Sequence, residues 1–128
     1  QPAEFKVNRF TEPYSNTIRR AELNIQGGAT TYSLNDTTSS LFEAEVKHQF
    51  AQYSLTRTTR DSVEVLSLKV PDSTNIRGSR GFNFNKVEML LNNKVIWDIN
   101  LEMGAGKVDF DLSEFKIANL NIEGFAEG

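Results

Sequence analysis

The sequence RGSRG combines residue types that bind anions. It places Arg77, Ser79 and Arg80 among glycines, and guanidinium groups form paired hydrogen bonds with phosphate, sulfate or carboxylate. Phe82 and Phe84 follow and offer flat faces on which a sugar ring could stack. The Lys-Ser/Thr ending of a phosphate-binding P-loop is missing, so a charged surface loop is the simpler interpretation. If any loop contacts a ligand we expect this one, because long irregular loops on β scaffolds often carry binding residues.

Carboxylates and a single imidazole are the other candidates for chemistry. Asp109, Asp111 and Glu114 lie in the segment DFDLSE, and paired carboxylates can bind a hard cation or hydrolyse a glycoside. They alternate with apolar residues, which is typical of the solvated face of a strand, and we favour that interpretation. His48 is the only histidine and lies among apolar residues, so we interpret it as a core residue. The sequence therefore predicts no catalytic residue, no metal site and no cofactor.

A short pattern that occurs three times predicts how the strands are arranged. Residues 23–30 read LNIQGGAT, residues 99–106 read INLEMGAG and residues 120–127 read LNIEGFAE. Each copy has an apolar-Asn-apolar triplet, then Gln or Glu, then a corner of small residues. The second and third copies are 21 residues apart, a spacing at which one strand unit stacks on the next. The structural positions that this pattern predicts are the corners Gly27, Gly28, Gly104, Gly106 and Gly124, and the core residues Trp97, Ile99 and Leu101.

Alternation with a period of two extends through most of the chain and predicts strands. We expect a hairpin in which a three-residue loop, 92–94, sets Leu91 opposite Val95 and Met89 opposite Trp97. The apolar parity changes within residues 62–70, which predicts a β-bulge or a bend between sheets. Asp111 and Ser113 are expected to close a turn by bonding backbone amides. No segment has a helical period, so the chain is predicted to be all-β.

Composition sets further limits. The chain has 128 residues, a net charge of −3 and no cysteine, which predicts one domain without disulfides and without a field that attracts nucleic acid. Neither a signal peptide nor an apolar membrane span is present, so a membrane is expected to be reached only through an anchor segment absent from this sequence. We expect residues 1–16 to form an extended lead-in and residues 17–128 a single β-repeat domain that is truncated at its C-terminal end.

The last third of the chain resembles a known family. The sequence WDINLEMGAGKVDFDLSEFKIANLNIEG is similar to the toast-rack domain of bacterial envelope and membrane proteins, including relatives of regulators that respond to cell-wall-active antibiotics. The matching positions are Trp97, Ile99, Leu101, the corner Gly104-Ala105-Gly106, the step Asp111-Leu112-Ser113, and Leu120, Ile122 and Gly124. The resemblance covers about the last 32 residues and extends weakly to the corner at residues 27–29.

This resemblance implies a fold and a class of function. It implies stacked, tightly turned strand repeats in an elongated sheet or solenoid-like domain, with a β-sandwich as the alternative. It also implies a non-enzymatic, extracytoplasmic structural or sensory domain of a bacterial envelope protein. Such a domain would act through a protein partner or through further domains of the same full-length chain. The alternatives are a surface adhesion module that binds carbohydrate or an anion through the loop containing Arg77, and, third, a small hydrolase.

Overall fold

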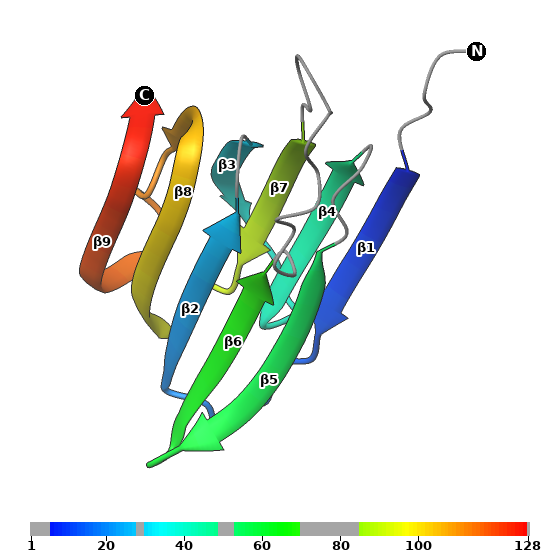
Figure 1. Cartoon of the computed structure of the whole chain (residues 1–128). Coiled ribbons are helices and arrows are strands. Elements are labelled where there is room, and N and C mark those ends of the chain that lie inside the picture. Colours follow the sequence, from blue (N-terminus) through cyan, green and yellow to red (C-terminus); the bar gives the residue numbers. More distant parts are fainter. Residues whose placement is uncertain (1–5, 28–29, 49–52, 70–84, 128) are drawn as a thin grey trace.

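The computed structural model describes residues 6–27, 30–48, 53–69 and 85–127, and these residues form strands joined by turns (Figure 1). The strands are β1 (Lys6–Glu12), β2 (Arg20–Gly27), β3 (Thr30–Thr37), β4 (Phe42–His48), β5 (Ser54–Arg60), β6 (Val63–Lys69), β7 (Asn85–Leu91), β8 (Ile96–Phe110) and β9 (Lys116–Glu127). No helix is present in this part of the chain, and none therefore that could cross a membrane. The predicted all-β class is confirmed.

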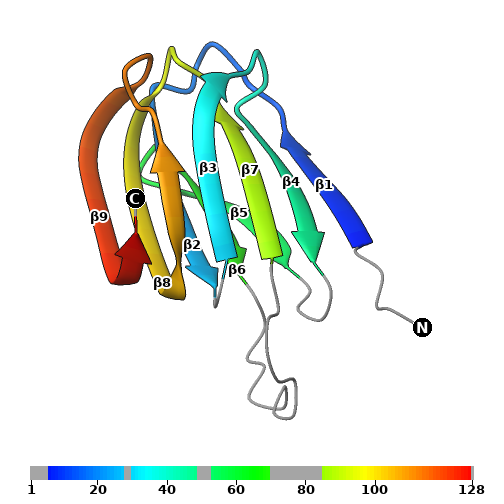
Figure 2. The same ribbon diagram turned by 90° about the horizontal axis from the view of Figure 1, so that it is seen from above.

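Hydrogen bonding links the strands in the order β1-β4-β7-β3-β8-β2-β6-β5, with β9 paired to β8. This continuous sheet is folded into two facing layers, because β8 bends. Residues 96–103 of β8 pair with β2 in one layer, and residues 106–110 pair with β3 in the other. Figure 2 shows β8 and β9 curving around one side of the molecule and joining the layers. The arrangement is sandwich-like, with a stack of bent strands along one side.

The threefold repeat is confirmed by the strand register. Leu23 of β2 lies opposite Ile99 of β8, and Ile99 lies opposite Leu120 of β9. All three strands run parallel, so the three copies form neighbouring strands of one stack. The third corner is one residue shorter than the sequence comparison predicted, since Gly106 lies opposite Ala126 rather than Glu127.

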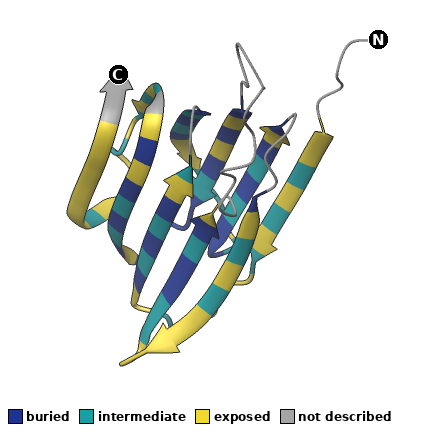
Figure 3. Cartoon of the chain, viewed as in Figure 1, coloured by how far each residue is buried: buried dark blue, intermediate teal, exposed yellow. Residues whose placement is uncertain are grey.

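The core lies between the two layers and is built from alternate residues of each strand (Figure 3). Trp97 and Ile99 are fully buried and Leu101 is 1% exposed. Burying side chains of this size contributes roughly 1.5–3 kcal/mol each. The other large, fully buried side chains are Tyr32, Phe42, Leu23, Ile25, Leu34, Leu41, Leu66, Leu68, Met89 and Leu91.

The predicted hairpin between residues 87–91 and 95–103 is wrong. β7 pairs with β3 and β4, whereas β8 pairs with β2, β3 and β9. The turn at residues 92–95 therefore carries the chain from one layer to the other as an arch. Leu91 and Trp97 both point into the core, as their alternation predicts, but they belong to opposite layers. Alternation reports which face of a strand is buried and does not report which strand lies beside it.

The predicted bulge or bend between sheets in residues 62–70 is also wrong for the part that the structure describes, residues 62–69. β6 pairs without a register shift with both β2 and β5. The apolar parity changes because Glu64, rather than an apolar residue, occupies an inner position near the start of β6. Arg57 of β5 pairs with it at 2.9 Å. Inward-pointing charges of this kind are a common protection of sheet edges.

The N-terminal segment is more structured than the expected lead-in. Residues 6–12 form β1, which pairs antiparallel with β4 from Lys6 opposite His48 to Glu12 opposite Phe42. Phe10 packs against the core. The sequence did not indicate this packing, because Pro2 and Pro13 are typical of an irregular segment.

Candidate interaction site

The bent strands turn at corners where glycine is required for two different reasons. Gly124 of β9 has a φ of 119°, which side-chain-bearing residues rarely adopt, and an added Cβ would collide with the carbonyl oxygen of Met103. At Gly27 of β2 the reason is close approach, since an added Cβ would lie 2.7 Å from the hydroxyl of Tyr53 and also collide with that of Tyr32. Gly28 lies outside the described residues. Gly104 lies in the bend of β8, and Gly106 lies opposite Thr30 of β3.

Beneath the corner of β2 is a buried cluster of hydroxyl groups. The hydroxyl of Tyr53 lies 2.8 Å from that of Thr30 and 3.3 Å from that of Tyr32. All three residues are at most 3% exposed. Burial raises the pKa of both tyrosines, because the phenolate would lose its hydration. Each hydroxyl group has a hydrogen-bond partner within the cluster. The cluster therefore holds the start of β3 beneath the corner of β2 without placing a charge in the core.

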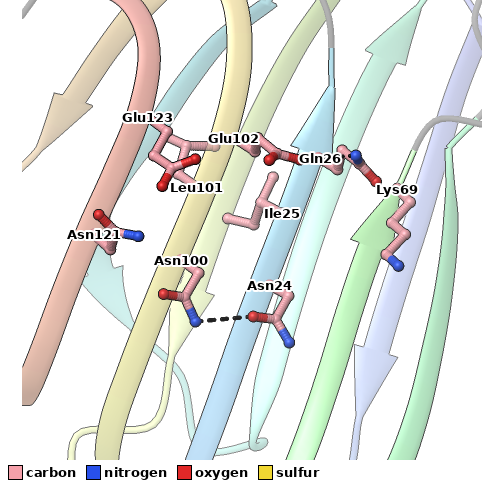
Figure 4. A pocket seen from close by; sticks show the side chains of 9 residues that line it. All are labelled: Asn24, Ile25, Gln26, Lys69, Asn100, Leu101, Glu102, Asn121 and Glu123. Atoms are coloured by element: carbon pink, nitrogen blue, oxygen red, sulfur yellow. Dashed lines mark hydrogen bonds between the residues drawn. The ribbon is translucent and has the colours of Figure 1, made fainter.

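The outer face of the β6-β2-β8-β9 layer carries rows of polar side chains that cross the strands (Figure 4). In one row Asn100 Nδ2 donates to Asn24 Oδ1 at 2.9 Å, and Asn121 of β9 is the next residue in register. In the next row Gln26 Nε2 donates to Glu102 Oε1 at 2.8 Å. Glu123 then lies opposite Glu102, so this row ends in two carboxylates.

A third row lies nearer the start of these strands. The guanidinium of Arg20 donates twice to the carboxylate of Asp98, at 3.0 and 3.1 Å. Asn119 of β9 also donates to Asp98, at 2.6 Å. The hydrogen bonds from Arg20 and Asn119 lower the pKa of Asp98. Each row thus continues from β2 through β8 to β9.

A shallow groove of about 390 Å³ crosses the same face and is polar along most of its length. Its lining residues are Asn24, Ile25, Gln26, Lys69, Asn100, Leu101, Glu102, Asn121 and Glu123. Amides and carboxylates in this arrangement can bind hydroxyl groups, amines or another row of amides. The groove reaches as far as β9.

β9 is the least covered strand of the stack. Leu120 and Ile122 are 44% and 38% exposed, whereas Ile99 and Leu101, which lie opposite them on β8, are 0% and 1% exposed. Figure 3 shows the contrast between the buried positions of β8 and the exposed length of β9. In the part of the chain that the structure describes, no strand pairs with the outer edge of β9. An exposed apolar edge of this kind is a template for pairing with another strand.

The other residues that the sequence singled out are placed as follows. Asp111 Oδ1 accepts hydrogen bonds from the backbone and hydroxyl of Ser113, at 3.1 and 2.7 Å, and these bonds lower the pKa of Asp111. This is the predicted turn between β8 and β9. Asp109 and Glu114 are exposed. Among the described residues no three His, Cys, Asp or Glu side chains converge on a point that could hold a metal.

His48 is placed at the seam between β1 and β4. It is 5% exposed, and its Nε2 lies 3.1 Å from Asn8 Nδ2, within hydrogen-bonding distance. Burial, with the charge of Lys6 nearby, lowers the pKa of His48. The imidazole is therefore packed at the pairing of β1 with β4.

The candidate contact residues Arg77, Ser79, Arg80, Phe82 and Phe84 lie outside the described residues. The sequence did not point to the polar rows or the uncovered edge of β9 as a site. One signal could have located them, namely the asparagine and the Gln or Glu that share one parity in all three repeats. Once the three copies are stacked, these residues must form rows on one face.

Comparison with known proteins gives a family and a fold. Residues 2–126 match the family model described as the N-terminal domain of toast_rack, DUF2154. No curated protein matches significantly. A candidate cell adhesion protein from Clostridium sporogenes ATCC 15579 has a similar structure, with a TM-score of 0.85 and 20% identity over 96% of this chain and 58% of that chain. A candidate adhesin from Bacteroides fragilis NCTC 9343 has a TM-score of 0.44 and 10% identity over 96% and 60%. The chain thus spans less than two thirds of each.

Proposed function

Because the chain belongs to the toast-rack N-terminal domain family, we propose that it is a non-enzymatic, extracytoplasmic structural or sensory domain of a bacterial cell-envelope protein. It acts through protein contacts, and the contact surface is the outer edge of β9. The description of the Clostridium sporogenes protein as a cell adhesion protein supports a place outside the cytoplasm.

The observation that carries this proposal is the exposure of Leu120 and Ile122 beside an unpaired strand edge. The opposite end of the same layer differs, since β5 points Arg57 inward and carries mainly polar residues. Edges protected in this way resist pairing, whereas β9 has no such protection. His48 supports the non-enzymatic part of the proposal, because its ring is engaged in packing β1 against β4.

Hydrogen–deuterium exchange tests the contact at β9. In this chain alone, the β9 amides that point away from β8 should exchange rapidly. In the longer protein that the family description implies, the same amides should be slowed by about tenfold or more, because a pairing strand must open before exchange. The edge amides of β5 are the matched control and should behave alike in both. Equal exchange of the β9 amides in both proteins would contradict the proposal.

A surface adhesion module that binds carbohydrate is the second candidate, and the polar groove beside β9 favours it. This function requires the melting temperature to rise on addition of an envelope polysaccharide, with the rise abolished by Asn100→Ala in the groove. Carbohydrate binding does not require the β9 amides to exchange more slowly in the longer protein than in this chain. The two functions are therefore distinguishable.

A further inference from the structure

We propose that the strand received by the edge of β9 runs parallel to it and repeats this chain's own pattern, with Lys, Arg or Gln opposite Glu123. The strand comes from the region that follows this domain in the full-length protein. This inference rests on the proposed function and specifies the partner in its direction, its register and its chemistry.

The direction follows from the bend in β9. β9 pairs parallel with β8 and bends near Gly124, which leaves a long first arm and a short second arm. A parallel partner can bend at the same point and pair along both arms. An antiparallel strand with the same arm lengths as β9 would place its short arm against the long arm of β9. A second copy related by a twofold axis through this edge would be antiparallel, so self-association is disfavoured.

The apolar positions of the partner follow from β8. Ile99 and Leu101 of β8 are buried because a strand lies on either side, β2 on one and β9 on the other. Leu120 and Ile122 repeat these positions but have a neighbour on one side alone. A further parallel strand with apolar residues in the same register would bury the apolar side chains of β9, as β9 helps to bury those of β8. The partner therefore has apolar residues opposite Leu120 and Ile122.

The polar positions follow from the rows on the outer face. The row Asn24–Asn100–Asn121 can be continued by another asparagine, since each amide both donates and accepts. The row Gln26–Glu102–Glu123 cannot be continued by a carboxylate without a third adjacent negative charge, because like charges on neighbouring strands repel. A cation or an amide opposite Glu123 offsets this repulsion.

The source of the strand follows from the family description. The matched model is described as an N-terminal domain, so the region that follows it is the segment tied to β9 by the shortest connection. A connection along the chain raises the effective concentration of that strand at the edge over that of any separate protein.

Site-directed disulfide capture tests the inference, since the chain has no cysteine of its own. The protein variant Asn121→Cys is incubated with a peptide of the β9 sequence, residues 116–127, that carries Asn121→Cys and Glu123→Lys. A buffer of reduced and oxidised glutathione supplies the disulfide that exchanges with the two thiols. In-register parallel pairing brings the two cysteines to adjacent positions. We expect this peptide to be captured about tenfold more than one with the cysteine moved to the position of Asn119. Fluorescence of Trp97, the single tryptophan, checks that the variant is folded.

A charge reversal tests the chemistry separately. The peptide with Glu123→Lys should be captured several-fold better than the peptide that keeps the glutamate, and the protein variant Glu123→Lys should reverse that preference. Equal capture at both cysteine positions, stronger capture of a reversed-sequence peptide, or an unchanged charge preference would overturn the inference. A disulfide dimer of the protein that outcompetes the peptide would also overturn it. None of these results alters the exchange test of β9, which decides the proposed function by itself.

Discussion

The hydroxyl of Tyr53 lies beneath the corner of β2 and forms hydrogen bonds with two residues at the start of β3. Its hydroxyl contacts those of Thr30 and Tyr32, and the three groups have little access to water. Replacing Tyr53 removes both hydrogen bonds and leaves the hydroxyls of Thr30 and Tyr32 buried without this partner, which costs about 1–3 kcal/mol per group. The position is therefore sensitive to the loss of a single oxygen atom.

Alkaline unfolding should report on this cluster. Burial raises the pKa of Tyr32 and Tyr53 in the folded chain, so the folded state keeps protons that the unfolded state releases. Stability from this source is complete below the unfolded pKa of about 10 and is lost as the pH rises further. Urea denaturation measures the free energy of unfolding at pH 8 and at pH 11. From pH 8 to pH 11 this free energy should fall less for Tyr53→Phe than for the natural chain. At pH 8 the variant should be the less stable of the two.

Tyr14→Phe is the matched control, because Tyr14 is half-buried and lies outside the cluster. It should have nearly the same pH dependence as the natural chain. An identical pH dependence in Tyr53→Phe would show that the buried hydroxyls do not govern alkaline stability.

At the scale of the element, the arch between β7 and β8 is organised by Asn92. Its side chain donates to the carbonyl of Ser40 at 3.1 Å and accepts from the backbone of Lys94 at 2.8 Å. Its own carbonyl accepts from Trp97 Nε1 at 2.9 Å. These contacts hold the chain as it crosses between layers, and they satisfy polar groups that would otherwise be buried alone.

Replacing Asn92 with alanine should therefore destabilise the protein by roughly 1–3 kcal/mol, because the side-chain hydrogen bonds with Ser40 and Lys94 are lost. The measurement is a urea titration followed by the fluorescence of Trp97, which lies at the arch itself. The neighbouring change Asn93→Ala affects an exposed side chain and should cost much less. Equal costs for the two variants would show that the arch does not depend on this side chain.

The elements also show what the sequence could predict. Alternation identified the buried faces of β2, β4, β7 and β8, and the repeat identified the register of the bent stack as far as its corners. The pairing of β7 could not be predicted, because a strand of correct parity fits a hairpin or an arch equally well. The site at β9 could not be predicted either, since the exposure of Ile122 depends on which strands lie beside it.

At the scale of the whole molecule, the bent strands join the two layers on one side, and an arginine bridges them on the other. Arg57 of β5 reaches Glu64 of β6 at 2.9 Å and Glu12 of β1 at 3.2 Å. Its side chain is 24% exposed, so the ion pairs are only partly screened by solvent. The bridge closes the open side of the sandwich.

Arg57→Met should lower stability by roughly 1–2 kcal/mol, discounted for partial exposure, since two carboxylates lose their shared cation. Urea denaturation at low and high salt measures the loss, which should shrink in high salt. Arg60→Met is the control, because Arg60 pairs with Glu22 while being 64% exposed. A similar loss in both variants would indicate that closing the open side does not contribute.

The parallel pairing of β8 has a consequence for the time course of folding. Asn24 and Asn100, neighbours in the stack, are 76 residues apart in the sequence. Closing so long a segment costs entropy before any contact compensates for it. β8 and β9 are closer in sequence, since Asp98 and Asn119 are 21 residues apart, so their pairing costs less entropy than the pairing of β8 with β2. Dominated by such distant pairings, the topology folds slowly, on the order of milliseconds to seconds.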